Sequence, residues 1–341
     1  MSIQTDVLVI GSGAAGAVAL ARAKERGLNA IGVSKSIGAS GYSSGAVDFY
    51  DLAPEALKLF QKLTASIGYV LTGYAVSQAG LVKQCLATQA SQAYELAAGG
   101  LLGVVELSGL TCFRAAPVAH MLKSQGYEAV PITAHLGHWN TFLEFAKDFE
   151  DPELLDSCMD AIVQAIEARS VDLKHVFVPA IFGLSPPMLF LRSLQMRAGV
   201  SFSELLGLSH SIPGLRLGNL LSQGFKAGSV ARFEYKAQRI TQVILDHGEV
   251  IEPKSVILAT GRFLSGGFGS QELLFGLPLV GEQRFKIGLA CDEHQRPLGA
   301  FGELFASNLF AAGSSLGGYD PAEDGGMARA IATGYRAGDL C

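Results

Sequence analysis

The sequence predicts an α/β fold, and three observations support this prediction. An apolar run at residues 7–10 enters a glycine-rich turn at residues 11–16, and a helical stretch then extends to Arg26. Gly27 ends that stretch, and a second apolar run occupies residues 30–34. Strand-like segments return in the second half of the chain. A strand, glycine turn, helix and strand in this order are typical of a Rossmann-like nucleotide-binding domain.

The order of the remaining elements predicts two domains. Helices are expected over residues 54–65, 76–96 and 151–168. Strands are expected over residues 230–235, 238–245, 255–259 and 308–312, before a last helix at residues 325–340. We therefore expect one nucleotide-binding domain formed by both chain ends, residues 1–55 and 225–341, with residues 56–224 inserted as a second domain.

The composition limits the classes of partner. Of the 341 residues, 49% are hydrophobic and 17% are charged, below the roughly 25% charged of an average soluble protein. Two explanations stay open: another subunit covers part of the surface, or the chain is a compact enzyme with a large core. The net charge of -5 and the lack of a Lys/Arg block argue against nucleic acid as a partner.

The cysteines and histidines do not predict a metal site. The chain has five cysteines: Cys85, Cys112, Cys158, Cys291 and Cys341. They have no C-x-x-C spacing, so neither an iron–sulfur cluster nor a zinc ribbon is expected. His135 and His138 lack a third ligand with suitable spacing, so a loop role is preferred. With neither a signal peptide nor an apolar run long enough to span a bilayer, we expect a cytoplasmic protein whose membrane contact is indirect.

The first turn has glycines at the three positions that a dinucleotide fold requires. Gly11 permits the tight turn, Gly13 lets the backbone approach a pyrophosphate, and Gly16 lets the helix lie against the strand. The amides of Ala14 and Ala15, at the helix start, face the same anion. The alternative, a glycine-rich turn without a ligand, leaves the order of the flanking elements unexplained.

The second strand ends in Ser34, where a dinucleotide fold usually has an acidic residue. A carboxylate accepts charge-assisted hydrogen bonds from the ribose, whereas serine offers one neutral bond. The difference is about 1–2 kcal/mol, or roughly ten- to thirtyfold in affinity. Ser34 is therefore expected to contact a cofactor weakly. Lys35 has two interpretations, a phosphate ligand or a solvated lysine.

Further glycine motifs indicate which cofactor is bound. Ala259, Thr260 and Gly261 follow a β-meander and an apolar strand, a combination typical of FAD-binding folds. The third motif lies after the strand at residues 308–312 and at the start of the last helix: Gly313, Ser314, Asp320, Gly325, Gly326 and Met327. Backbone amides and the positive end of that helix suit an electron-rich flavin ring.

The loop after the second strand completes the predicted cofactor site. Ser43, Ser44 and Gly45 suit a loop around the cofactor's phosphates or ring, and an ordinary polar turn is the alternative. The four elements in their expected order predict a flavin, FAD or FMN. They also specify the fold class, a Rossmann-like FAD/NAD(P)-binding domain with a three-layer ββα architecture.

With these motifs identified, the sequence resembles the B subunit family of bacterial anaerobic glycerol-3-phosphate dehydrogenase, within the wider fumarate reductase-like FAD-binding superfamily. The resemblance runs through most of the chain and rests on residues 43–48, 176–184, 212–217, 257–267 and 308–321. The family also lacks the acid after its second strand. This chain departs from the family in being shorter, with deletions placed between about Ala115 and Asp172.

The resemblance implies a cofactor, partners and a location. The flavin described for the family is FMN, whereas the fold alone suggests FAD. The implied partners are a second flavoprotein subunit, which carries glycerol-3-phosphate oxidation, and an iron–sulfur subunit that anchors the complex at the membrane. This chain is then expected to lie on the inner face of the membrane through those partners.

The sequence offers three candidate catalytic residues. His210 and Arg216 flank Pro213-Gly214, where the histidine can move a proton and the arginine can pair with a substrate phosphate or carboxylate. A loop histidine and a structural ion pair are the alternatives. Arg262 beside the 259–261 turn can offset the charge of reduced flavin, and a surface arginine is the alternative.

Three functions remain open from the sequence. The first is a flavin-bearing subunit of a respiratory glycerol-3-phosphate dehydrogenase that relays electrons toward a quinone. The second is a stand-alone flavin oxidoreductase of another small hydroxy or unsaturated acid. The third is a scaffold that has kept the fold and lost the cofactor.

Overall fold

The computed structural model describes residues 2–96, 99–208, 211–267, 277–281, 286–320 and 325–341. The chain divides into two compact units. The first comprises Met1–Gly41, Tyr50–Ala65 and Gly218–Cys341, and the second comprises Tyr42–Phe49 and Ser66–Leu217. Relative to the sequence-based boundaries, residues 56–65 and 218–224 fall in the first unit and residues 42–49 in the second.

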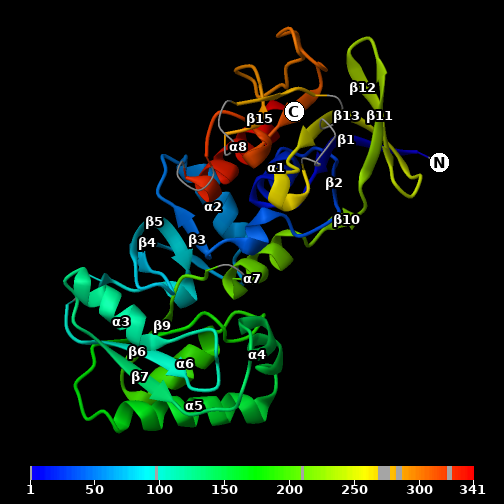
Figure 1. Ribbon diagram of the computed structural model, residues 1–341. Coiled ribbons are helices and arrows are strands. Elements are labelled where there is room, and N and C mark those ends of the chain that lie inside the picture. Colours follow the sequence, from blue (N-terminus) through cyan, green and yellow to red (C-terminus); the bar gives the residue numbers. More distant parts are fainter. Residues whose placement is uncertain (1, 97–98, 209–210, 268–276, 282–285, 321–324) are drawn as a thin grey trace. The chain divides into compact units, whose positions relative to one another are not determined.

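A mainly parallel sheet forms the centre of the first unit (Figure 1). Strand β1 (Ile3–Ile10) pairs in parallel with β2 (Ala30–Ser34) on one side and with β13 (Val250–Leu258) on the other. The parallel order continues through β10 (Phe225–Ala227) beside β2 and β16 (Leu309–Ala311) beside β13. These five strands come from both ends of the chain, and they confirm the predicted α/β fold of Rossmann-like type.

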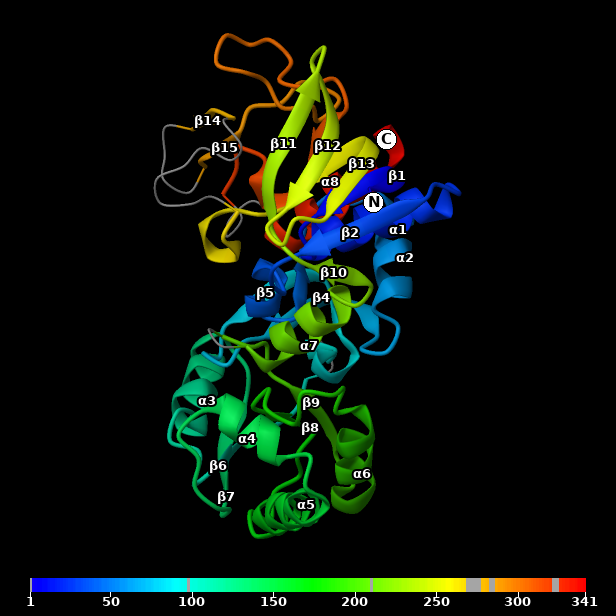
Figure 2. The same cartoon turned by 90° about the vertical axis from the view of Figure 1, so that its right-hand side faces the viewer.

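An antiparallel meander extends the same sheet beyond β13. Strands β11 (Val230–Lys236) and β12 (Arg239–Leu245) form a hairpin, and β12 pairs with the start of β13 (Figure 2). The strand expected at residues 255–259 therefore corresponds to the second half of β13, and the first half of β13 belongs to the meander. Two short strands, β14 (Leu279–Val280) and β15 (Gly288–Leu289), form a separate ladder.

Three helices pack in the first unit: α1 (Ala14–Glu25), α2 (Pro54–Leu63) and α8 (Gly326–Leu340). Helices α1 and α8 approach closely, because a Cβ on Gly334 would overlap the carbonyl oxygen of Ala15. Helix α2 starts with a proline, which needs no amide partner in the first turn. It contacts both α1 and α8, which explains why residues 56–65 belong to this unit rather than to the insertion.

The second unit contains two sheets (Figure 2). A parallel sheet has the order β7 (Ala129–Ala134), β6 (Leu102–Leu107), β8 (His175–Val178) and β9 (Ser201–Glu204). Its helices are α3 (Ala115–Ser124), α4 (Phe142–Asp148), α5 (Pro152–Glu167) and α6 (Met188–Ala198). The second sheet is antiparallel, with the order β3 (Ala46–Asp48), β5 (Val82–Gln89) and β4 (Tyr69–Val76). Helix α7 (Ile212–Leu221) spans the boundary at Leu217.

The helix predicted over residues 76–96 is wrong. That segment contains the end of β4, a turn, strand β5 and the 3₁₀ turn Ala90–Gln92. Gly80 has φ +80°, and a Cβ there would come 2.6 Å from the carbonyl oxygen of Val118. This left-handed glycine turn reverses the chain where the pattern had suggested a continuous helix.

Candidate functional site

The first glycine turn is packed too tightly for side chains at two positions. Gly11 has φ +106°, and a Cβ on it would overlap the carbonyl oxygen of Ala259. A Cβ on Gly16 would overlap the carbonyl oxygen of Gly11. The start of α1 therefore lies directly against the turn, and the turn lies against the end of β13.

The amino end of α1 has an anion-binding geometry. Gly13 is the N-cap and supplies no side-chain hydrogen bond. The amides of the first turn, including those of Ala15 and Gly16, have no intrahelical acceptor either. A Cβ on Gly13 would meet only the Ser40 hydroxyl, at 3.5 Å. A phosphate can thus approach this backbone, as the sequence predicts.

Ser40 is a site residue that the sequence analysis missed. Its hydroxyl accepts a hydrogen bond of 2.9 Å from the amide of Ala14, and the residue is 9% exposed. Gly38, with φ +67°, brings this segment so close that a Cβ on it would lie 3.0 Å from the nitrogen of Gly13. The small residues at 38–40 were the available signal, because they let the loop fold over the start of α1.

Ser34 is engaged within the protein. Its hydroxyl donates to the carbonyl oxygen of Ser36 at 2.7 Å, and the Ser12 hydroxyl lies 2.9 Å from it. Its hydrogen-bonding capacity toward a ribose is therefore reduced further than the loss of the carboxylate alone implies. Lys35 is exposed, in agreement with the alternative of a solvated lysine.

The later glycine turns converge on the first one. Gly313 has φ +69°, and a Cβ on it would come 2.7 Å from the Cβ of Ala15 in α1. Gly261 has φ +74°, and its added Cβ would meet the Ser314 hydroxyl at 3.4 Å. The turns after β1, β13 and β16 thus lie together at the carboxyl edge of the parallel strands, the edge at which such sheets bind nucleotides.

Two hydroxyl groups at these turns are available to form hydrogen bonds with a ligand. The Thr260 Oγ1 and Tyr319 Oη atoms are buried, and neither has a hydrogen-bond partner within the described ranges. A buried polar atom without a partner is unfavourable. Together with the open backbone at Gly13, these atoms fit a polar ligand with phosphate and hydrogen-bonding ring groups, which is the character of a flavin nucleotide.

Arg262 connects two of the converging turns. Its guanidinium donates to the carbonyl oxygens of Ser314 at 2.6 Å, Leu316 at 2.8 Å and Tyr319 at 2.9 Å. The residue is 8% exposed, so the alternative of a surface arginine is wrong. Burial lowers the pKa of Arg262, and Asp320 opposes that shift electrostatically.

The start of α8 forms the remaining part of the third motif. Gly325 is the N-cap with φ +78°, and a Cβ on it would lie 2.9 Å from the ring of Tyr50. Gly326 is the first helical residue, and Met327 is buried. The positive end of this helix therefore lies beside an aromatic ring.

Ser43, Ser44 and Gly45 belong to the second unit. The Ser44 carbonyl oxygen accepts hydrogen bonds of 3.0 Å from both the Gln92 side chain and the Gly207 amide. The Ser43 hydroxyl is buried without a partner in the described part of the chain. Their contact with a cofactor stays a prediction.

Arg216 forms a structural ion pair, which is the alternative to the substrate-binding role that the sequence suggests for it. Its guanidinium forms a bidentate pair with Glu204, at 2.6 and 3.0 Å, and donates to the carbonyl oxygens of Phe182 and Gly183. Four of its five N–H donors are thereby used, and the residue is 3% exposed. Arg216 is therefore no longer a candidate for binding a substrate phosphate. His210, its predicted neighbour in the site, lies outside the described residues.

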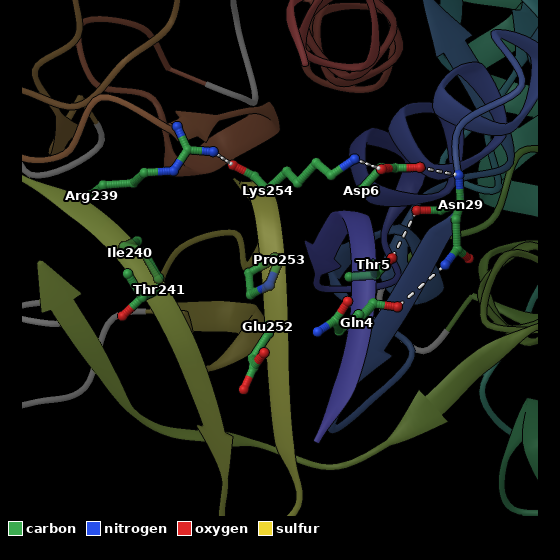
Figure 3. Close-up of a pocket in the computed structure, with 10 residues that line it drawn as sticks. All are labelled: Gln4, Thr5, Asp6, Asn29, Arg239, Ile240, Thr241, Glu252, Pro253 and Lys254. Carbon is green, nitrogen blue, oxygen red and sulfur yellow. Dashed lines mark hydrogen bonds and ion pairs between the residues drawn. The ribbon is translucent and has the colours of Figure 1, made fainter. Parts of the chain in front are cut away.

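A depression of about 440 Å³ lies at the opposite edge of the first unit's sheet (Figure 3). It is lined by the early parts of β1 and β13, with Asn29 and the start of β12. Lys254 pairs there with Asp6 at 2.7 Å, and Arg239 donates to the Lys254 carbonyl oxygen at 2.6 Å. The depression lies at the amino ends of β1 and β13, away from the glycine turns at their carboxyl ends, so it is not the predicted cofactor site.

Neither a metal-binding cluster nor a membrane-spanning helix is found in the described ranges. Those ranges contain no cluster of three His, Cys, Asp or Glu side chains arranged to hold a metal. Within the same residues, no helix has both the length and the apolar character needed to cross a bilayer.

Residues 6–69 match the family described as FAD binding domain. This match agrees with the parallel sheet and the converging turns, which give the first unit the Rossmann-like fold of FAD-binding domains.

Among curated proteins, the chain is similar to the B subunit of anaerobic glycerol-3-phosphate dehydrogenase. It is 29% identical to the Pasteurella multocida protein over 66% of this chain and 60% of that protein. It is 25% identical to the Pectobacterium carotovorum protein over 94% of each. The resemblance predicted from the motifs is thereby confirmed. The chain spans 60% of the length of the Pasteurella relative and 49% of that of the Histophilus somni relative.

A solved structure, the open conformation of a flavocytochrome c3 fumarate reductase, is also similar. The identity is 13%, the TM-score is 0.42, and the match covers 99% of this chain and 78% of that chain.

Proposed function

We propose that this chain is the flavin-bearing subunit of a respiratory oxidoreductase of the anaerobic glycerol-3-phosphate dehydrogenase type. In this role it passes electrons from the oxidation of sn-glycerol 3-phosphate toward a quinone. The names of the curated relatives support the type of enzyme. The observation that carries the proposal is the convergence of three glycine turns around buried, unpartnered hydroxyls of the described residues.

Each part of the site has a distinct task toward the cofactor. The amides at the start of α1, with the Ser40 hydroxyl beside them, hold the phosphate. Thr260 and Gly261 on one side, and Gly313 and Ser314 on the other, position the ring. A bound flavin supplies the ability to take up two electrons and release them again.

Arg262 is a positioning residue in this proposal. It uses its donors on backbone carbonyls of the loop after β16, and so fixes that loop against the turn after β13. Its positive charge lies near the ring site and favours a cofactor that becomes negative on reduction. The predicted offset of flavin charge by Arg262 thus takes this electrostatic form.

One observation favours FAD as the cofactor and another favours FMN. The family match describes an FAD binding domain. The internal hydrogen bonds of Ser34 weaken recognition of an adenosine ribose, which agrees with the FMN implied by the resemblance. The mass of the cofactor released from purified protein distinguishes the two flavins directly.

The proposed partners are a second flavoprotein subunit and an iron–sulfur subunit at the membrane. The low charged fraction of the chain, 17%, suits a surface that other subunits cover. On this proposal the chain resides in the cytoplasm, on the inner face of the membrane, through its partners.

Purification tests the proposal. The protein is expected to be yellow, to release a flavin on denaturation and to reduce an artificial acceptor with glycerol 3-phosphate only when the partner chains are present. A colourless protein that takes up neither flavin contradicts the proposal. Turnover by the isolated chain would instead favour the stand-alone oxidoreductase.

A further inference from the structure

Tyr319 lies between two arginines in the first unit. The guanidinium carbon of Arg329 is 3.9 Å from the centroid of its ring, and that of Arg262 is 5.0 Å away. The Tyr319 side chain is 1% exposed, and its hydroxyl has no hydrogen-bond partner among the described residues. Two cations therefore flank a buried ring whose hydroxyl is unused.

The two arginines are not equivalent. Arg262 donates to three backbone carbonyls and has Asp320 nearby. Arg329 has, within the described ranges, neither a hydrogen bond from its guanidinium nor an ion pair, and it is only partly buried. Its donors are thus available to a ligand, while its stacking on Tyr319 fixes the plane of the group.

The position of Arg329 in its helix is electrostatically unfavourable by itself. It is the fourth residue of α8, whose first turn contains no acidic residue. A cation near the positive end of a helix is destabilising, and an anion there is stabilising. A negatively charged ligand would interact favourably with both the positive end of α8 and the guanidinium of Arg329.

Tyr50 lies beside the start of α8 as well. Its ring would meet a Cβ on Gly325, the N-cap of α8, at 2.9 Å, so the absence of that Cβ makes room for the ring. Burial raises the pKa of Tyr319 to about 12, with Tyr50 contributing in the same direction and both arginines opposing it. The Tyr319 phenol therefore stays protonated at neutral pH and can donate a hydrogen bond to an anion.

From this geometry we infer that Arg329, Tyr319 and Tyr50, at the start of α8, form a binding site for a small oxyanion, a phosphate or a carboxylate. We call this group the α8 anion site. In the context of the proposed function, on which this source assignment rests, the oxyanion is the phosphate of the substrate, because the start of α1 holds the phosphate of the cofactor. Arg329 binds it in a bidentate manner, and the Tyr319 hydroxyl donates to it.

The test measures binding of inorganic phosphate to the full chain by calorimetry, in flavin-loaded and flavin-free protein. Arg329→Met removes the charge and keeps most of the side-chain length, and Tyr319→Phe removes only the hydroxyl. Arg336→Met is the matched control, because Arg336 lies on the exposed side of the same helix. We expect Arg329→Met to weaken phosphate binding about tenfold or more and Tyr319→Phe about three- to tenfold. Arg336→Met is expected to bind like the wild type.

Comparison of the loaded and free forms identifies the source of the oxyanion. Equal phosphate affinity in both forms assigns the site to a separate substrate, and glycerol 3-phosphate is then expected to compete with phosphate. Displacement of phosphate on loading with FMN would contradict the assignment to a substrate, because the cofactor would then occupy the site.

Two results would overturn the inference. One is no saturable phosphate binding to either form up to about 10 mM. The other is an Arg329→Met affinity equal to that of Arg336→Met. Arg329→Lys keeps the charge and provides a folded variant if Arg329→Met is unstable, with an intermediate affinity expected. Flavin content, read from absorbance of the same samples, separates a failure of the proposed function from a failure of the anion site.

Discussion

Gly313, in the turn after β16, lies directly against Ala15 in the first helix, because a Cβ on the glycine would come 2.7 Å from the Cβ of the alanine. Gly313→Ala adds this clash to the strain of a left-handed backbone at φ +69°. Gly27→Ala is the matched control, since Gly27 has φ +80° with no atom within 4 Å of an added Cβ. We expect Gly313→Ala to lower the free energy of unfolding by about 1–3 kcal/mol more than Gly27→Ala, measured by urea denaturation. Equal effects would show that the two segments are not in contact.

Gly13 is expected to control cofactor binding without controlling the fold. Its φ of -66° suits any residue, and an added Cβ makes only an ordinary contact with Ser40. Gly13→Val should therefore fold but lose flavin about tenfold or more, because the branched side chain blocks the phosphate. Flavin content per folded protein, from absorbance and circular dichroism, checks this outcome. Unchanged flavin content would show that the turn does not hold the phosphate.

Ser40 is expected to act on both stability and cofactor affinity. Ser40→Ala removes the acceptor for the Ala14 amide and should lower the free energy of unfolding of the flavin-free protein by about 1 kcal/mol. Ser40→Asp places a carboxylate at the positive end of α1, which should preserve or raise that stability and repel a phosphate. Thermal unfolding and flavin titration of the two variants measure the two effects. An aspartate variant that binds flavin as tightly as the wild type would contradict the placement of the phosphate.

The buried pair of Arg216 and Glu204 is expected to be structural. Glu204→Ala leaves the arginine buried and unpaired, and should lower the free energy of unfolding by about 3–5 kcal/mol. Asp160→Ala breaks the exposed pair with Arg197 and serves as the control, with an expected loss of about 1 kcal/mol or less. Chemical denaturation of the full chain compares them. Similar losses for both variants would mean that burial does not set the strength of the Arg216 pair.

His175 is expected to make stability depend on pH. Burial lowers its pKa to about 3, and its ring nitrogens lie 2.7 Å from the hydroxyls of Ser201 and Ser203. The folded state therefore holds the neutral ring, while the unfolded chain takes up a proton below about pH 6.5. Stability is fully present above pH 6.5 and falls as the pH decreases toward 3, by up to about 1.4 kcal/mol per unit.

Unfolding measured between pH 7 and pH 4 checks this dependence. His175→Gln can still hydrogen-bond to both serines but does not titrate, so its stability should lose this contribution to the slope. Parallel curves for the two proteins would show that His175 is not responsible.

The sequence was sufficient to predict the first unit's central strands and the convergence of its turns. Glycines at positions 11 and 16 are required by local close approaches, so their spacing carries the information. The segment that holds the end of β4 and all of β5 is predicted as a helix because its apolar residues suit either period, and the deciding contact of Gly80 is with Val118, far along the chain. The ion pair of Arg216 with Glu204 and the stacking of Arg329 on Tyr319 also depend on tertiary placement, which no local pattern specifies.

The pairing of Ile3 with Ile251 has a consequence for biosynthesis. At a translation rate of about 5–20 residues per second, β13, the partner of β1 on one side, leaves the ribosome roughly 12 to 50 s after it. The second unit is complete at Leu217 and can collapse during that interval. The nascent amino-terminal strand has β2 available but must meanwhile stay unaggregated without β13 on its other side, so cofactor capture is among the last events in the maturation of the polypeptide.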